Sequence, residues 1–247
     1  MSCKVPTIRT FRIDQAHLPA THTEADSTGF MLLHSGIIAN ELGESFAFAM
    51  QELTGYAPTP IVQQALQGSV DWRIEIATCD GDNDVRVRVG EPDADDPRAV
   101  GTITDDDYTA QRGCARIPLG TLTDAVGGAP PGWVTADRLA VDLHGDTELD
   151  GHIGMMVAAP PTAIAIADAL APFLTKNLAA GIDTGELMGI DANGDNVITT
   201  TELQMSSIFE SLTVADGTLT DFTDIPRCPD DVTQWISVGL AVHATAL

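Results

Sequence analysis

The chain has 247 residues and is strongly acidic, since 36 Asp and Glu against 12 Lys and Arg give a formal net charge of −24 at pH 7. A surface of this sign repels nucleic acid and anionic membranes and attracts cations, so a nucleic-acid-binding function is not expected. Hydrophobic residues make up 44% and suffice for a sizeable core, but no apolar run reaches the 18 or more residues of a transmembrane helix.

The N-terminal part is predicted to contain one strand and two helices. The strand covers residues 5–16, where apolar side chains nearly alternate. His17 and His22 follow in a Pro- and Thr-rich stretch. Two histidines five residues apart could bind a transition metal, but without a Cys partner or helical context a solvated loop is favoured. A helix over 30–54 and a short helix over 61–66 are expected next.

From Val70 the apolar period changes to two. A β-hairpin is predicted from strands at 70–77 and 85–89, joined by an acidic turn. Further short strands are predicted at 99–103, 114–117, 139–143 and 151–157. His144 and His152 are read as paired strand residues rather than metal ligands.

The last third combines the longest helix with a closing strand. The helix is predicted over 162–180, because Pro160-Pro161 suits a helix start and Gly181 a helix stop. Alternating apolar residues from Trp235 to Ala246 predict a final strand.

Between these two elements lies an acidic twelve-residue stretch, residues 191–202, whose oxygen-bearing positions suit a hard cation. Calcium takes six to eight oxygens at roughly 2.3–2.6 Å. The Val197 ligand would be its backbone carbonyl, and Glu202 can give both carboxylate oxygens. The candidate ligands are Asp191, Asn193, Asp195, Val197, Thr199 and Glu202.

This stretch resembles the calcium loop of the EF-hand family, whose pattern is D-x-[DN]-x-[DN]-G with Glu at position 12. One departure is clear: position 6 is Asn196 rather than Gly, although Asn tolerates the required positive φ best among other residues. Ile198 at position 8 is expected to pack inward. Short flanking helices are expected over 184–188 and 200–212. Because sensor EF-hands work in pairs and no second good loop is found, the resemblance implies a structural clip.

A weaker ion-ligand spacing occurs in the hairpin turn. Asp80, Asp82 and Asp84 alternate, and Glu91 follows eleven residues after Asp80. Val85 occupies the tight-turn position and begins strand sequence, so a second calcium site here is not favoured.

The four cysteines are widely spaced and contain no C-x-x-C pair. An even set in an acidic calcium-binding chain suggests disulfides and an oxidising compartment. Three pairings are possible, and Cys79–Cys114 with Cys3–Cys228 is preferred. The alternatives are four buried free thiols and a Cys3 that stands near the lipidation cysteine of a bacterial lipoprotein.

The element order predicts an α+β fold, with an antiparallel, sandwich-like β-sheet and helices packed on one side. We treat the chain as one domain, 1–247. Its β-rich body covers about 1–159 plus the closing strand 232–247, and a helical calcium-binding insertion covers about 160–218.

The combination of an acidic, β-rich chain with one EF-hand-like loop is similar to uncharacterised secreted or lipoprotein-like bacterial proteins. The resemblance implies an extracellular or cell-envelope location. The sequence lacks a signal peptide, so the chain is either cytosolic or a mature segment with a start Met added.

The favoured function is therefore a calcium-binding secreted or cell-envelope domain, structural or adhesive, with Ca²⁺ as a structural clip. Common catalytic motifs are missing, but the 36 acidic residues leave an extracellular hydrolase with an acidic active site as an alternative. A cytosolic calcium buffer or sensor is the second alternative.

Overall fold

The computed structural model describes residues 6–19, 21–30, 40–41, 43, 71–79, 83–90, 99–104, 107–118, 133–181, 187–212, 217–218 and 234–247. The strands are β1 (Thr7–His17), β2 (Arg73–Thr78), β3 (Asp84–Gly90), β4 (Ala99–Thr104), β5 (Asp107–Pro118), β6 (Trp133–His144), β7 (Glu148–Ala158), β8 (Gly217–Thr218) and β9 (Gln234–Ala246). The helices are α1 (His22–Thr28), α5 (Ala159–Ala179), α6 (Leu187–Ile190), α7 (Thr200–Met205) and α8 (Ser207–Leu212).

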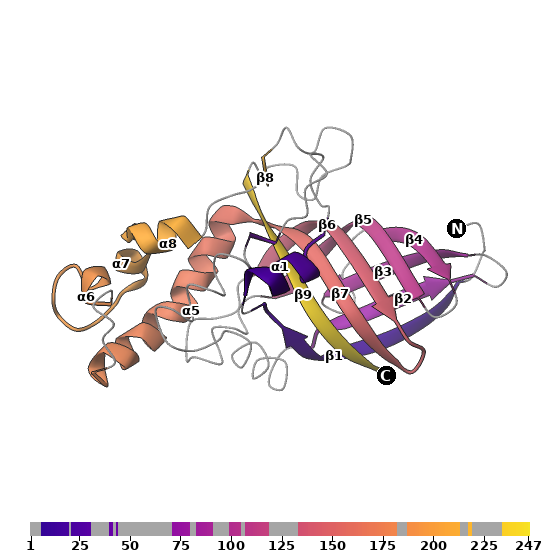
Figure 1. The fold of residues 1–247 in the computed structure, drawn as a ribbon, viewed down its shortest axis with the longest axis horizontal. Coiled ribbons are helices and arrows are strands. Elements are labelled where there is room, and N and C mark those ends of the chain that lie inside the picture. The colour runs from indigo at the N-terminus through magenta and orange to yellow at the C-terminus, as the bar shows by residue number, and fades with distance from the viewer. Residues whose placement is uncertain are drawn as a thin grey trace.

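Eight of these strands form a closed barrel. Their order is β1-β2-β3-β4-β5-β6-β7-β9, and an additional antiparallel pairing of β9 with β1 completes the ring (Figure 1). The two-residue β8 extends the sheet at the start of β9. All pairings are antiparallel except a single parallel bridge between β3 and β5.

The predicted α+β fold, a sandwich-like sheet with helices packed on one side, is therefore wrong. Strand alternation shows that one face of each strand is buried, but it does not show what that face packs against. A second sheet and the opposite wall of a barrel both require the same period of two. Closure depends on the pairing of β1 with β9, which joins residues more than 200 positions apart.

The barrel interior is filled by alternate residues of its strands. Ile74 and Ile76 of β2 are fully buried there, as are Leu139 and Leu143 of β6. One gap among the described side chains, beside Trp72, has a volume of about 10 Å³, which is room for about one water molecule. The described interior side chains thus form a packed core, as expected for eight strands.

Most predicted elements that fall in the described residues are confirmed, with shifted ends. β1, the β2–β3 hairpin, β4, α5 and β9 match their predictions, whereas β5 and β6 begin earlier than expected. The predicted helices over 30–54 and 61–66 lie outside the described residues, apart from residues 40, 41 and 43.

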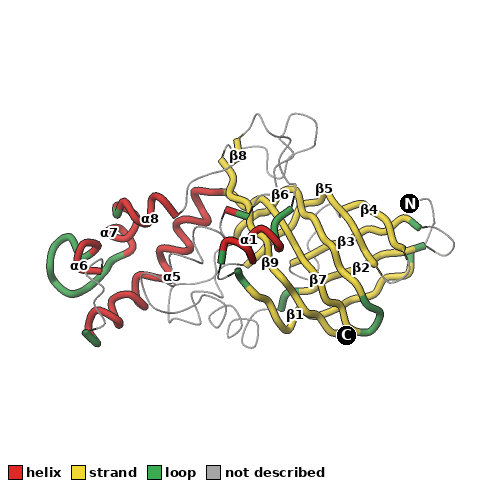
Figure 2. Tube along the Cα trace, in the orientation of Figure 1, coloured by secondary structure: helices red, strands yellow, loops and turns green. Residues whose placement is uncertain are grey.

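Helices α5 to α8 gather at one end of the barrel and form what we call the helical lobe, residues 159–181 and 187–212 (Figure 2). The lobe has its own apolar cluster, in which Leu170 and Leu174 of α5 pack with Ile198, Leu203 and Phe209. Its residues fall in the predicted insertion, and the single-domain assignment stays a prediction.

In the described part of the chain, every helix is too short or too polar to span a membrane.

Two opposed glycines let α1 approach the outer barrel wall. Gly154 of β7 and Gly239 of β9 are direct cross-strand partners. A Cβ at Gly239 would collide with the carbonyl oxygen of Thr28, and a Cβ at Gly154 with the ring of Phe30. Glycine is therefore required at Gly239, where the clash is with backbone, and at Gly154 a larger residue would displace the Phe30 ring.

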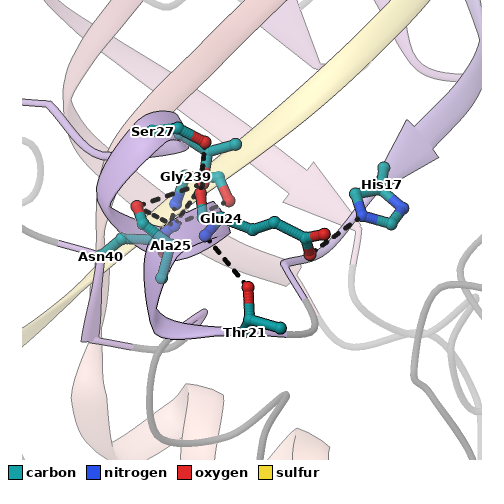
Figure 3. A network of polar contacts seen from close by, with 8 residues as sticks. His17, Thr21, Glu24, Ala25, Ser27, Asn40 and Gly239 are labelled. Carbon is teal, nitrogen blue, oxygen red and sulfur yellow. Dashed lines mark hydrogen bonds and ion pairs between the residues drawn. The ribbon is translucent and has the colours of Figure 1, made fainter.

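The buried side chain of Asn40 fixes this contact (Figure 3). Its Nδ2 donates to Thr28 Oγ1 at 2.8 Å and shares further contacts with the carbonyls of Ala25 and Gly239. Its Oδ1 accepts from the backbone N–H of Gly239 at 2.7 Å and of Gly43 at 3.1 Å. One amide thus satisfies backbone groups of three separate segments.

We predict that Asn40→Ala lowers the free energy of unfolding by about 2–4 kcal/mol, because it leaves buried backbone groups of Gly239 and Gly43 without partners. Urea denaturation at fixed pH and calcium concentration measures the change. Ser27→Ala is the control, since the exposed Ser27 hydroxyl only bonds within α1, and should change stability by less than about 0.5 kcal/mol. Equal losses in the two variants would contradict the role of Asn40.

Candidate functional site

Five of the six candidate ligands lie between α6 and α7 in the helical lobe, and the sixth, Glu202, lies in the first turn of α7. The predicted incoming helix 184–188 is described only from Leu187, where the one-turn α6 begins. The predicted continuous helix 200–212 is wrong, because α7 and α8 are separated at Ser206. The Ser206 hydroxyl donates to the carbonyl of Leu203 at 2.7 Å and accepts from the N–H of Phe209 at 3.2 Å. It ends one helix and begins the next.

The loop backbone is wrapped around the carboxylate of Asp191, which is only 9% exposed. Its Oδ1 accepts from the N–H groups of Gly194 at 2.9 Å and Asp195 at 3.2 Å, and its Oδ2 from Asn196 at 2.9 Å. Asn193 Oδ1 accepts from the N–H of Asp195 at 2.9 Å. Asp195 Oδ1 in turn accepts from the N–H of Val197, two residues later, at 2.8 Å.

The turn requires two residues with positive φ. Gly194 has φ 72°, and Asn196 has φ 64°, the only positive value among the described non-glycine residues. The expectation that Asn196 adopts this conformation in place of glycine is confirmed.

Thr199 and Glu202 form a reciprocal cap at the start of α7. Thr199 Oγ1 accepts from the N–H of Glu202 at 3.2 Å, and Glu202 Oε2 accepts from the N–H and hydroxyl of Thr199 at 3.0 and 2.8 Å. These bonds from Thr199, with smaller contributions from the N–H groups of Asn193 and Ala192, lower the pKa of Glu202. Glu202 is therefore ionised at neutral pH and faces the start of the loop.

Thr175 of α5 is a residue that the sequence did not point to. Its hydroxyl accepts from the N–H of Ile198 at 2.8 Å and donates to the carbonyl of Ile198 at 3.1 Å. Ile198 is 2% exposed and packs into the lobe core, as predicted. No sequence motif links the two residues, because they are 23 positions apart on different elements.

The described residues contain no group of three or more His, Cys, Asp or Glu side chains arranged to hold a metal ion, and the calcium site at this loop stays a prediction. A carboxylate has about four lone-pair positions, and the Asp191 carboxylate uses three of them for N–H groups. Asp195 Oδ1 accepts one N–H, from Val197. The Glu202 carboxylate already receives both donors of Thr199 and the N–H groups of Asn193 and Ala192, so a bound cation would have to displace some of these donors. The remaining candidates are an amide, a hydroxyl and a backbone carbonyl, which are ordinary calcium ligands.

The second ion site considered in the hairpin cannot be compared with the structure. Asp80, Asp82 and Glu91 lie outside the described residues, and Asp84 is the first residue of β3. This site stays a prediction that was not favoured.

His144 and His152 do not lie directly opposite each other. In the register of β6 with β7, His144 lies opposite Asp150 and His152 opposite Asp142, so the two histidines are diagonal neighbours.

The predicted loop at His17 and His22 is also corrected. His17 ends β1 and His22 begins α1, because Thr21 caps that helix by accepting from the N–H of Glu24. His17 Nε2 lies 3.6 Å from a carboxylate oxygen of Glu24.

Cys79 is buried and disulfide-bonded. Cys3 and Cys228 lie outside the described residues, and the side chain of Cys114 on β5 is not described. The preferred pairing of Cys79 with Cys114 therefore stays a prediction.

His243 on the outer barrel face is a titratable site that sequence reasoning missed. Its Nδ1 lies 2.6 Å from Asp14 Oδ1, and Asp14 is placed there by a bulge in β1. The hydrogen bond with Asp14 raises the pKa of His243, partial burial opposes the shift, and the charges of Asp14, Asp150 and Glu148 add to it.

We predict that Asn196→Val lowers the thermal stability of the calcium-free protein by about 1–2 kcal/mol, because a β-branched residue is strained at positive φ. Asn196→Gly should be neutral or slightly stabilising. Thermal melting in EDTA measures both effects. Ala192→Val is the matched control in the same exposed loop without positive φ, and an equal effect of the two valines would contradict the prediction.

We predict that part of the stability is lost as pH rises. Because folding raises the pKa of His243, protonated His243 stabilises the fold fully below its ordinary pKa of about 6.5 and ceases to do so above the folded value. Asp14→Asn should return the pKa toward the ordinary value and flatten this component. The imidazole titration followed by NMR, with urea denaturation at two pH values, measures both. An unchanged titration in Asp14→Asn would show that the contact is unimportant.

No family model matches the chain, and it shows no significant similarity to a curated protein or to a solved structure.

Proposed function

We propose that this protein is a calcium-binding secreted or cell-envelope domain, structural or adhesive, in which one Ca²⁺ clips the helical lobe. The observation that supports this most is a single loop with six candidate oxygen ligands in sequence order, in which the backbone N–H groups of Gly194, Asp195 and Asn196 wrap around the nearly buried Asp191. The ligands would be Asp191, Asn193, Asp195, the Val197 carbonyl, Thr199 and Glu202. The ion would supply the positive charge at the centre of the loop.

Electrostatics favours a cation there. Asp191, Asp195 and Glu202 place three carboxylates in twelve residues, on a chain with a formal net charge of −24. Like charges in one loop repel each other, and a divalent ion converts that repulsion into attraction. The lowered pKa of Glu202 keeps its charge available at neutral and mildly acidic pH.

The position of the loop favours a structural role. Ile190 directly precedes the loop, Ile198 lies within it, and both are buried in the apolar cluster with α5. Drawing the loop around an ion would therefore also hold α6 and α7 against α5. An ion that binds only the folded lobe must stabilise it, by about 2.7 kcal/mol at a hundredfold excess over the dissociation constant.

The alternative functions have less support. A general acid in a hydrolase needs a raised pKa. Among the described carboxyl groups, those of Asp71 and Glu202 have shifted pKa values, and hydrogen-bond donors lower both of them. The disulfide at Cys79 favours an oxidising compartment over the cytosol of a calcium sensor or buffer.

We predict that calorimetric titration of EDTA-treated protein gives about one bound Ca²⁺, and that millimolar calcium raises Tm by about 5–10 °C. Glu202→Gln should abolish or strongly weaken both effects, because it removes a charged bidentate ligand. Glu210→Gln on α8 is the control, since it removes the same charge outside the loop and should leave both effects intact. No heat of binding and no Tm shift in the wild type would overturn the proposed function.

A further inference from the structure

The Thr175 hydroxyl binds both backbone polar groups of one residue inside the loop. It accepts from Ile198 N–H and donates to Ile198 C=O, with distances of 2.8 and 3.1 Å. A hydroxyl has one donor and two acceptor positions, so its donor is committed here. The same hydroxyl could otherwise have bonded a carbonyl of its own helix. The long helix α5 thus reaches into the loop through a single atom.

The first of these bonds determines the direction of the Val197 carbonyl. In a planar trans peptide, the carbonyl oxygen of one residue and the N–H of the next point in opposite directions. Since the N–H of Ile198 points at Thr175, the Val197 oxygen must point away from α5. Val197 is the position whose backbone carbonyl is the proposed ligand.

The second bond determines the next peptide in the same way. The Ile198 carbonyl points at Thr175, so the N–H of Thr199 points away from it, and this N–H donates to Glu202 Oε2 at 3.0 Å. The Glu202 carboxylate is thereby oriented by a peptide that Thr175 holds. One hydroxyl on α5 fixes two consecutive peptide planes that serve two proposed ligands.

We propose that Thr175 is the positioning residue of the calcium loop, holding Val197 and Glu202 in their binding orientation before the ion arrives. The proposal rests on the proposed function of the loop. It explains how a single loop without a paired second loop could be preorganised, because the support comes from a helix side chain. Preorganisation raises affinity by lowering the ordering cost of binding.

A second threonine contact between the same elements provides a matched control. Thr200 Oγ1, at the start of α7, donates to Asp168 Oδ1 on α5 at 2.8 Å. This bond also ties α7 to α5, but it touches none of the proposed ligands. Thr200→Val therefore tests what a lost contact in the lobe does without changing the orientation of a ligand peptide.

The experiment is calcium titration by calorimetry on the EDTA-treated full chain, with apo Tm measured in parallel. Thr175→Val removes both bonds and nearly keeps the shape, and Thr175→Ala removes them while favouring helix. We expect either variant to raise the Kd for Ca²⁺ about 10–100-fold, the usual effect of losing an outer-shell partner. Thr175→Ser keeps the hydroxyl and should stay within about threefold of wild type, as should Thr200→Val even where its apo Tm falls.

The outcomes separate the two proposals. Calcium binding by the wild type, together with weaker calcium binding by Thr175→Val and Thr175→Ala, supports both the calcium loop and the positioning role. Wild-type binding with unchanged Kd in these variants, even with a lower apo Tm, would overturn the positioning role and leave the calcium loop intact. An equal loss in Thr200→Val would overturn it as well, because a general effect of lobe stability would then account for the result. No calcium binding by the wild type would overturn both.

Discussion

The arrangement of the whole molecule depends on β9, because this strand is hydrogen-bonded along both of its edges. It pairs with β7 over its whole length and with β1 over its second half. Without it the sheet would expose two unpaired edges, which are sites of association for other chains. The outer face of the same strand receives the Asn40 network at Gly239. Barrel closure and the docking of α1 are thus joined on one strand.

The helical lobe is held together by contacts of its short helices with α5. Its helices α6 to α8 are short, and helices of six residues are not stable alone in water, so they depend on the long helix α5 and on the apolar cluster around Ile198. The acidic loop is the most highly charged part of this lobe, and its three carboxylates accept hydrogen bonds from backbone N–H groups. Polar side chains, including Thr175, Asp168 and Ser206, provide the remaining ties between helices.

The elements could be predicted where a local signal was strong. Alternation located the strands, and the prolines and Gly181 located α5, but no local signal distinguishes a closed barrel from a sandwich. The loop pattern predicted the positive φ of Asn196 and the burial of Ile198. The sequence did not predict the contact of Thr175 with Ile198 or that of His243 with Asp14, because both depend on register and packing between elements far apart in the sequence. The helix break at Ser206 depends on one hydroxyl that competes with the helix backbone.

The connection between β7 and β9 has a consequence for how such a molecule could change over time. Ala158, the last residue of β7, lies directly opposite Trp235 near the start of β9. The chain therefore leaves the barrel and returns to it at adjacent points, as in an ordinary hairpin whose turn has been replaced by the helical lobe. Antiparallel neighbours can be joined by a turn of two residues. The barrel topology consequently places no demand on the length or content of the lobe, and a helical attachment there could be acquired, exchanged or lost while the barrel strands keep their partners.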